Sequence, residues 1–294
     1  MTSGKVELGR KLFYDPRLSS DDSVSCSSCH LQAFAFADPR PVSTGVEGRS
    51  GTRNAPSLAN VGYRKGLFWE GRSPKLELQA VAPLTDHLEM NMEPDVLIEK
   101  IASLPEYEGE FETVFGKPVS MKGVTYALSA FQRSLVSKDS PYDRYRAGDR
   151  TALDEAAVRG LTLFFNEQGD CFHCHVGGDL TDELPHNNAN RADYTADMGL
   201  ARVTGRVEDI GKFKTPSLRN VALTAPYMHD GSYPTLREVI ENYNRGGFEH
   251  PNADTFMRPL GLSNAEIDDL IAFLESLTDE TFIRSERFSN PFVD

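Results

Sequence analysis

The four cysteines of this 294-residue chain belong to two short motifs of the form Cys-x-x-Cys-His. This spacing is the attachment signature of c-type haem, because two thiols bond the vinyl groups of the porphyrin and the adjacent histidine reaches the iron. The residues therefore predict two covalently bound haems, each with one histidine ligand. The two pentads are Cys26-Ser27-Ser28-Cys29-His30 and Cys171-Phe172-His173-Cys174-His175.

Other chemistry of paired cysteines fits this pattern less well. A thioredoxin-like pair needs a βαβ context that the sequence does not suggest, and a zinc site would leave both adjacent histidines without a role. A disulfide between residues three apart is strained. Covalent c-type haem is assembled outside the cytoplasm, so we expect a periplasmic protein whose signal peptide has been removed, since the N-terminus lacks an apolar signal core.

Charge and hydropathy exclude two classes of partner. The net charge of −13 and the pI near 5.0 argue against nucleic acid, which needs a basic surface. A positively charged protein partner would fit this charge, as would a merely soluble surface. The chain has no apolar run long enough to span a bilayer, so no membrane insertion is expected.

Helix signals dominate the segments that must position the pentads. Helices are expected at 73–81, 94–104, 120–135 and 151–167. Two capping boxes, Thr235 with Glu238 and Ser263 with Glu266, each precede an apolar stripe of helical spacing. Convincing strand patterns are few. The fold class is therefore mainly α.

An internal repeat predicts how the chain is divided. The octapeptide NAPSLANV at 54–61 aligns with KTPSLRNV at 214–221, and the alignment continues without a gap. We expect two cytochrome-c-like haem domains: 1–148 with a peroxidatic, high-spin haem and 149–294 with a low-spin haem. The last ~15 residues are expected to pack back on the first domain.

Several stretches carry a family resemblance across nearly the whole chain. They resemble the bacterial di-haem cytochrome c peroxidases and their relative MauG. The resemblance implies an iron-containing oxidoreductase of the peroxidase type that works by electron transfer. The stretches are LGRKLFYDPRLSSDDSVSCSSCH, RNAPSLANV, FWEGR, LELQAVAP and FKTPSLRNVALTAPYMHDG.

The second axial position of each iron distinguishes members of this family. Where the ordinary peroxidases have a histidine that ligates the first haem, this chain has Val46, which cannot ligate iron. His87 is a nearby substitute, although an exposed or hydrogen-bonded histidine is the simpler expectation. The resemblance therefore implies a first haem that is five-coordinate through His30 and open to peroxide. An open position favours peroxide or oxygen chemistry.

At the second haem, Tyr243 stands where the ordinary peroxidases have a methionine ligand, as in MauG. Tyr243 also lies on an apolar stripe and could be a core aromatic, and Met228 and Met257 are weaker ligand candidates. A phenolate is a hard anionic donor that stabilises oxidised iron, whereas methionine raises the haem potential.

Further roles come from the resemblance alone. It implies that Glu89 moves the proton during O–O cleavage with Gln79 as a polar neighbour, and that Trp69 relays a hole between the haems. It also implies a calcium ion between the haem units, bound by Asn54 and by the carbonyls of Thr224 and Pro226. Without the family resemblance, the sequence would indicate a solvated carboxylate at Glu89, a turn residue at Asn54 and a core aromatic at Trp69. His229 and Asp230 are expected near the second haem, and His173, His186 and His250 as bystanders.

These features favour a MauG-like enzyme. It would use hydrogen peroxide to form a high-valent di-haem state and oxidise a tryptophan or tyrosine of a periplasmic partner protein. Gly169 stands where MauG has the surface tryptophan that it uses toward methylamine dehydrogenase, so that substrate is not expected. Two alternatives stay open: a peroxidase supplied with electrons by a small cytochrome or cupredoxin, and a non-catalytic di-haem electron carrier.

Overall fold

The computed structural model describes residues 1–293, which form two compact units. Unit 1 contains Met1–Arg64, Ser73–Val136 and Ile283–Asp294, and unit 2 contains Lys65–Arg72 and Ser137–Phe282. This grouping differs from a single division at 148, because the main boundary falls between Val136 and Ser137. In addition, the loop 65–72 belongs to unit 2 and the C-terminal segment to unit 1. In the described part of the chain, no helix is both long and apolar enough to cross a membrane.

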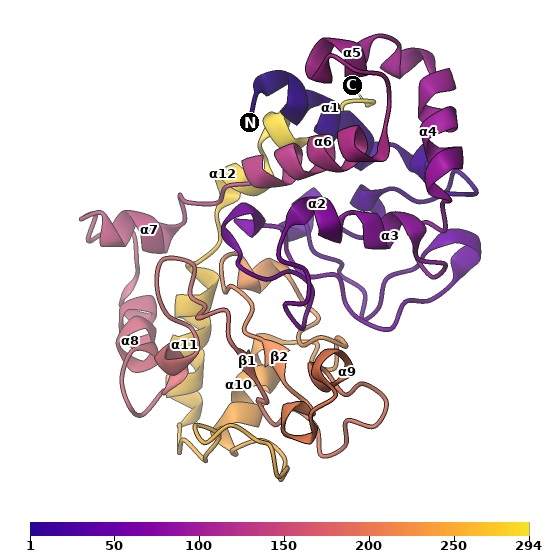
Figure 1. Ribbon diagram of the computed structural model, residues 1–294. Helices are drawn as coiled ribbons and strands as arrows, with labels where there is room; N and C mark the ends of the chain where they lie inside the picture. Colours follow the sequence, from indigo (N-terminus) through magenta and orange to yellow (C-terminus); the bar gives the residue numbers. More distant parts are fainter. Residues whose placement is uncertain (294) are drawn as a thin grey trace. The chain divides into compact units, whose positions relative to one another are not determined.

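Unit 1 is built from α-helices joined by long loops that contain short 3-10 helices (Figure 1). Its α-helices are α1 (Ser3–Tyr14), α2 (Leu76–Gln79), α3 (Val81–Thr85), α4 (Pro94–Ser103), α5 (Glu110–Phe115) and α6 (Met121–Ser134). Its 3-10 helices are Pro16–Leu18, Cys26–Ser28, Gln32–Phe34, Val46–Gly48, Val61–Tyr63, Pro105–Tyr107 and Glu286–Phe288.

Helices α1 and α6 cross closely and form the core of unit 1 (Figure 1). Their contact depends on Gly9, where a Cβ atom would lie 1.9 Å from the carbonyl oxygen of Ala127. Any larger residue would push the helices apart. Around the crossing, Phe13 packs against Phe131 and Phe36 with ring centroids 5.1 and 6.0 Å apart. All three rings are fully buried.

Unit 2 is also mainly helical, with one two-stranded antiparallel ladder that pairs Pro185 with Lys214. Its α-helices are α7 (Pro141–Arg146), α8 (Glu155–Phe164), α9 (Ala201–Thr204), α10 (Leu236–Asn244) and α11 (Asn264–Glu275), and α12 (Glu280–Ile283) ends at its boundary. Its strands are β1 (Pro185–His186) and β2 (Phe213–Lys214), and its 3-10 helices are Cys171–His173, Val207–Asp209 and Val221–Leu223.

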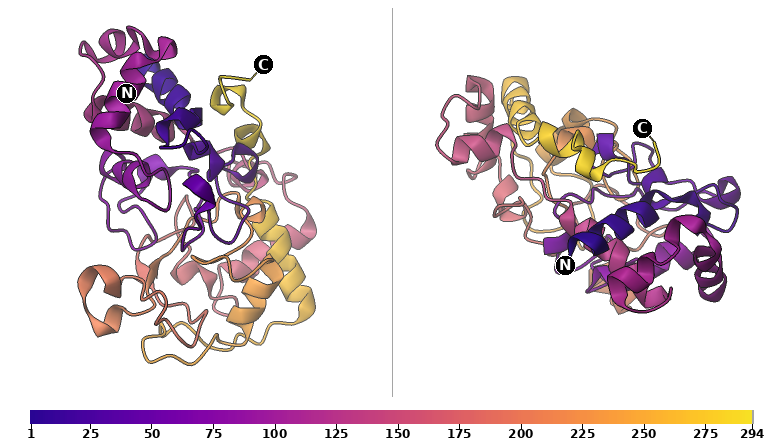
Figure 2. Two further views of the ribbon diagram at one scale, coloured as in Figure 1. Left: turned by 90° about the vertical axis from the view of Figure 1, so that its right-hand side faces the viewer. Right: turned by 90° about the horizontal axis from the view of Figure 1, so that it is seen from above.

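The core of unit 2 repeats the helix crossing of unit 1. Helices α8 and α11 lie side by side, and the view from above in Figure 2 shows them as neighbouring pink and yellow helices. A Cβ atom at Gly160 would lie 1.9 Å from the carbonyl oxygen of Asp269, the same distance as at the first crossing. Phe273 packs against Phe164 and Tyr142 at 5.0 and 5.4 Å. Each unit therefore contains one glycine-dependent pair of crossed helices.

The octapeptide repeat corresponds to a repeated local structure. Asn60 and Asn220 both take the left-handed conformation, with φ of 58° and 60°, and each precedes a 3-10 helix. The backbone amide of Asn60 donates to Leu135, and that of Asn220 donates to Leu277. Asparagine tolerates this conformation better than most residues. The mainly α fold class with two related units is confirmed.

Most expected helices form, with shifted ends. Both predicted capping boxes are present, at the start of α10 and of α11. The helix expected at 73–81 is interrupted, because α2 ends at Gln79 and α3 begins at Val81. Pro83 has no amide hydrogen to donate to the carbonyl of Gln79, which prevents one continuous helix. The helix expected at 151–167 begins only after Asp154, whose side chain accepts a hydrogen bond from the amide of Ala157.

Candidate functional site

The first pentad lies on the 3-10 helix Cys26–Ser28 and the turn that follows it. The amide of His30 donates to the carbonyl of Cys26 at 3.0 Å, so the pentad closes into one compact turn. Neither cysteine forms a disulfide. Burial, together with the charges of Cys29 and Glu89, raises the pKa of the Cys26 thiol to about 12.

His30 is oriented by the backbone. Its Nδ1 lies 2.8 Å from the carbonyl oxygen of Phe36, which selects the tautomer that carries hydrogen on Nδ1. Burial lowers the pKa of His30, so the ring is neutral at neutral pH. A neutral imidazole with its Nδ1 hydrogen bound to a carbonyl presents Nε2 to a metal, which is the usual arrangement of a metal-ligating histidine.

The second pentad repeats this arrangement. The amide of His175 donates to the carbonyl of Cys171 at 2.9 Å, and its Nδ1 lies 3.0 Å from the carbonyl oxygen of Leu180. Burial lowers the pKa of His175 as well. Both pentads therefore fit c-type haem, because each offers two thiols outside any disulfide and one neutral imidazole held for iron.

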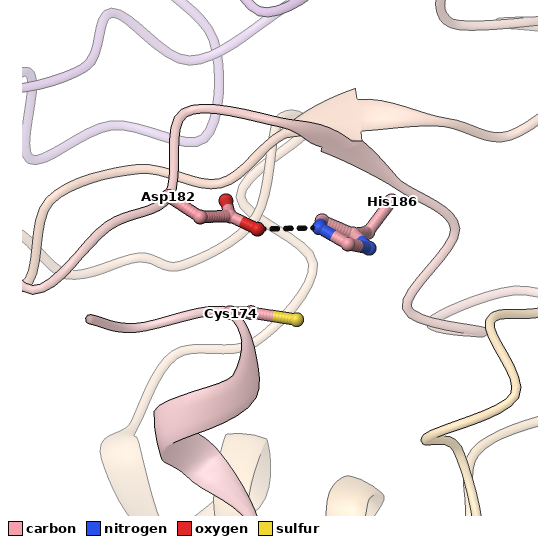
Figure 3. Close-up of side chains that lie close together, drawn as sticks. All are labelled: Cys174, Asp182 and His186. Carbon is pink, nitrogen blue, oxygen red and sulfur yellow. Dashed lines mark hydrogen bonds and ion pairs between the residues drawn. The ribbon is translucent and has the colours of Figure 1, made fainter.

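A second group of ligand-type atoms lies next to this pentad. Figure 3 shows the sulfur of Cys174 beside the paired side chains of Asp182 and His186. His186 lies between Asp182 at 2.8 Å and Asp254 at 2.5 Å. A hydrogen bond with Cys174 and the two carboxylates raise the pKa of His186 to about 10, although burial opposes the shift. Attachment of a haem would convert the Cys174 thiol to a thioether, so that Cys174 no longer belongs to this group. His186 would then lie between the carboxylates of Asp182 and Asp254 alone.

In unit 1, a backbone hydrogen bond joins Val46 to Glu89. The amide of Val46 donates to the carbonyl of Glu89 at 2.9 Å, and the Val46 side chain is fully buried. The negative charge of Glu89 helps to raise the pKa of both Cys26 and Cys29, after the larger effect of burial. The Glu89 carboxylate therefore lies within electrostatic range of the first pentad.

Gln79 and His87 have different surroundings. Gln79 is half-buried at the end of α2, one short helix before the turn in which the amide of Glu89 donates to Asp86. His87 lies in that turn with 72% of its side chain exposed and its Nδ1 3.5 Å from Asp86. His87 is thus an exposed histidine, as the simpler expectation had it.

Trp69 belongs to unit 2, within the loop 65–72. Its carbonyl accepts a hydrogen bond of 2.7 Å from the amide of Lys214, at strand β2. Its ring meets His229 edge to face, with centroids 6.4 Å apart. His229 is buried and stacks on Phe213 at 3.7 Å. Trp69, His229 and Phe213 therefore form one chain of ring contacts.

Tyr243 lies on α10 with its phenolic oxygen in a polar contact. The side-chain amide of Asn188 donates to this oxygen at 3.0 Å and to the sulfur of Met228 at 3.4 Å. Burial raises the pKa of Tyr243 to about 12, and the thiols of Cys174 and Cys171 act in the same direction. The oxygen of Tyr243 thus lies within electrostatic range of the second pentad, and Met228 stays a neighbour.

The expected calcium ligands are distributed over both units. Asn54 lies in unit 1, where its buried side-chain amide donates to the carbonyls of Asp38 and Arg40 at 2.9 and 2.8 Å. Thr224 and Pro226 lie in unit 2, and the bond from Ala225 to Pro226 is cis. The calcium site stays a prediction.

The structure identifies one residue that sequence reasoning missed, Asn188, and gives the physical reason for the glycine at position 169. Asn188 has no motif of its own, and only the fold places it against Tyr243. At Gly169, a Cβ atom would lie 2.1 Å from the carbonyl oxygen of Leu163, so any side chain would collide with the backbone there. The sequence shows this glycine two residues before the second pentad, and the contact with Leu163 explains it.

Family models match both halves of the chain. Residues 3–151 match the family model described as di-haem cytochrome c peroxidase, and residues 157–278 match the one described as cytochrome c. The first match ends between α7 and α8, and the second begins inside α8.

Individual relatives match nearly the whole chain. The methylamine utilization protein MauG of Methylorubrum extorquens is 37% identical, over 95% of this chain and 80% of its own length. Cytochrome c551 peroxidase of Pseudomonas aeruginosa is 35% identical, over 92% of this chain and 78% of its own. Among solved structures, a MauG-like protein associated with microbial copper homeostasis has a TM-score of 0.94 and 40% identity, over 100% of this chain and 94% of that chain.

Proposed function

The chain belongs to the family of di-haem cytochrome c peroxidases and MauG, and on that premise we propose that it is a MauG-like enzyme. Family membership makes it an oxidoreductase with two c-type haems. When bound, these haems supply the reaction with hydrogen peroxide and the storage of two oxidising equivalents. The enzyme then withdraws two electrons from a tryptophan or tyrosine of a partner protein. Its place is the periplasm, where c-type haem is assembled.

The four cysteines and two histidines of the pentads hold the haems in this proposal. Cys26 and Cys29 attach the first haem and Cys171 and Cys174 the second, while His30 and His175 ligate the irons. The role of the two histidines is supported by the backbone carbonyl beside each Nδ1, from Phe36 and Leu180. That contact fixes the imidazole ring so that its Nε2 is available to the iron. The residues 1–148 and 149–294 are proposed as the peroxidatic and the low-spin haem domain.

The observation that carries the proposal is Val46. Its side chain is aliphatic and fully buried, and its backbone is tied to the carbonyl of Glu89. Such a side chain offers no ligand atom, so peroxide could reach the first haem without the loss of a protein ligand. An enzyme of this kind reacts in its resting oxidised form.

Glu89 is proposed as the group that moves the proton. Cleavage of the O–O bond requires a proton to pass from the inner to the outer oxygen, which leaves as water. The carboxylate of Glu89 lies within electrostatic range of Cys26 and Cys29. Gln79 is its proposed polar neighbour, positioned by α2.

Tyr243 and Trp69 are proposed to hold and relay the oxidising equivalents. Tyr243 would ligate the second iron as a phenolate, which favours the oxidised state. Asn188 supports this role because its amide donates to the phenolic oxygen and stabilises negative charge there. Trp69 would pass the hole, and its edge contact with His229 fixes its ring. Calcium bound by Asn54, Thr224 and Pro226 completes the proposal.

The route of electron transfer between the partner protein and the haems cannot use a side chain at residue 169. The backbone carbonyl of Leu163 leaves no room for a side chain at Gly169. The absence of a side chain at Gly169 and the similarity to cytochrome c551 peroxidase support a second candidate function. This function is the removal of hydrogen peroxide with electrons from a small cytochrome or cupredoxin. Tyr243 argues against it, since a phenolate ligand lowers the potential at which electrons could enter.

A single rapid-mixing experiment tests the proposal. The as-isolated, fully oxidised protein is mixed with one equivalent of hydrogen peroxide, and its absorption spectrum is followed in a stopped-flow instrument. A species two oxidising equivalents above the resting protein should form within the first second and persist. A protein that stays silent until one haem is reduced would be a peroxidase of the ordinary kind. Silence in both states would make it an electron carrier.

A further inference from the structure

A cluster of three ligand-type side chains lies on unit 2, where the loop after α8 leads into the second pentad. The Nε2 atom of His173 is 3.0 Å from Oδ1 of Asp170 and 3.7 Å from Oε2 of Glu167. All three atoms lie within 4.8 Å of one another. The loop holds them by a tight turn, in which the amide of Asp170 donates to the carbonyl of Asn166 at 2.9 Å.

Asp170 provides the observation that points to a ligand. Only 6% of its side chain is exposed, and within residues 1–293 its Oδ1 accepts no hydrogen bond. The 3.0 Å approach of His173 does not meet hydrogen-bond geometry. The other oxygen, Oδ2, is 3.0 Å from Arg258. A buried carboxylate oxygen without a partner is costly, so this atom is expected to bind something.

Of the other two side chains, His173 is held by packing and Glu167 is free to move. The ring of His173 lies parallel to that of Phe256, with centroids 4.3 Å apart and an angle of 8°, and touches the ring of Phe172 at 4.2 Å. Arg258 donates to the backbone carbonyl of Glu167 at 2.7 Å, which fixes that backbone. The carboxylate of Glu167 is 82% exposed and can close over an ion.

The spacing of the three side chains is compatible with a shared metal ion, since the exposed Glu167 can approach by a few tenths of an ångström. Two ligand atoms that are each about 2.1 Å from one ion lie about 3.0 Å apart at a right angle and about 3.4 Å apart at the tetrahedral angle. One imidazole nitrogen and two carboxylate oxygens form a set that zinc and similar divalent ions accept. The two carboxylates also outweigh the single charge of Arg258, so the site is negative.

We propose that Glu167, Asp170 and His173 form a surface site for one divalent transition-metal ion of the zinc type, with water completing its shell. His173 stands between Cys171 and Cys174 in the sequence, so the ion would lie beside the attachment of the second haem. The site shares no residue with the predicted calcium ligands, and it assigns a role to His173.

The test measures zinc binding to the haem-loaded protein in a buffer that contains calcium. Isothermal titration with zinc chloride should show one site in the unmodified protein. The variants His173→Ala and Glu167→Gln should each weaken it about tenfold or more. The variant His87→Ala is the matched control, because His87 also lies beside a carboxylate, Asp86, but belongs to no cluster of three ligand-type groups among residues 1–293. It should bind zinc like the unmodified protein.

Two results would overturn the site. One is the absence of zinc binding at ~1 mM, which would mean that the cluster is an ion pair between His173 and Asp170. The other is unchanged zinc binding in His173→Ala and Glu167→Gln. Unchanged haem spectra and melting temperatures of both variants show that they fold. Glu167→Gln alters an exposed side chain and therefore keeps the test informative if His173→Ala folds poorly.

Discussion

The side-chain amide of Asn188 donates a hydrogen bond of 3.0 Å to the phenolic oxygen of Tyr243. Burial raises the pKa of Tyr243 to about 12, and the amide acts in the opposite direction. A buried neutral tyrosine also takes a hydrogen-bond partner, but a phenolate gains more from a donor. The contact is therefore compatible with the ligand role proposed for Tyr243.

Replacement of Tyr243 by phenylalanine should abolish the long-lived oxidised species, because the second iron would lose the anionic ligand that we propose for it. Stopped-flow spectra after one equivalent of peroxide provide the measurement. Tyr227→Phe is the matched control, since Tyr227 is also shielded from water and donates only to the carbonyl of Val221. If the oxidised species persists in Tyr243→Phe, Tyr243 is a core aromatic residue and not an iron ligand.

The Val46 position predicts the spin state of the resting protein. We expect a high-spin ferric component from the first haem, because Val46 provides no sixth ligand. Electron paramagnetic resonance at low temperature measures it, and the variant Val46→His should convert this signal to low spin. A wild-type spectrum without any high-spin component would contradict the assignment.

Replacement of Glu89 by glutamine should slow the reaction with peroxide by a factor of about 10² to 10⁴, the usual contribution of general acid–base catalysis. The haems should still attach, and the resting spectrum should not change. Glu93→Gln, at the cap position before α4, is the control and should react at the normal rate. Equal rates for Glu89→Gln and the unmodified protein would exclude Glu89 as the proton carrier.

Removal of calcium tests the predicted ligands Asn54, Thr224 and Pro226. Dialysis against EGTA should reduce formation of the oxidised species, and added calcium should restore it, because the ion holds backbone carbonyls in place. Metal analysis before and after dialysis gives the stoichiometry. A protein that contains no calcium and reacts normally would remove calcium from the proposal.

Asp279 predicts a pH dependence of stability. Burial acts to raise its pKa, but hydrogen bonds from Thr281, Phe282, Lys138 and Asp139 outweigh it and lower the pKa below 3.8. A group whose folded pKa is depressed stabilises fully above its unfolded value, and this stabilisation is lost as pH falls through the folded value. Asp279→Asn should therefore lower the free energy of unfolding by about 3 kcal/mol at pH 7.

Guanidinium unfolding at several pH values measures this effect. The difference between Asp279→Asn and the unmodified protein should stay constant above pH 5 and shrink below about pH 4. Asp149→Asn alters an exposed carboxylate whose pKa is also lowered, and it should change stability little. A constant difference at all pH values would show that the lost contacts are independent of charge.

Local sequence signals predicted much of the fold. The capping boxes at Thr235 and Ser263 begin α10 and α11 as expected, because a cap depends on residues only three apart. The shared octapeptide marks two similar turns, at Asn60 and Asn220. Helix α1 was not expected, since its stability depends on packing against α6 rather than on its own propensity.

The sequence by itself determined the two pentads and the family, because covalent haem attachment needs residues at fixed short spacing. Only the tertiary structure decided which distant groups meet them. It placed Asn188 against Tyr243 and Glu89 near Cys26. These pairings join segments far apart in the chain, and no local pattern encodes them, since they arise from the packing of helices and the course of the loops between them.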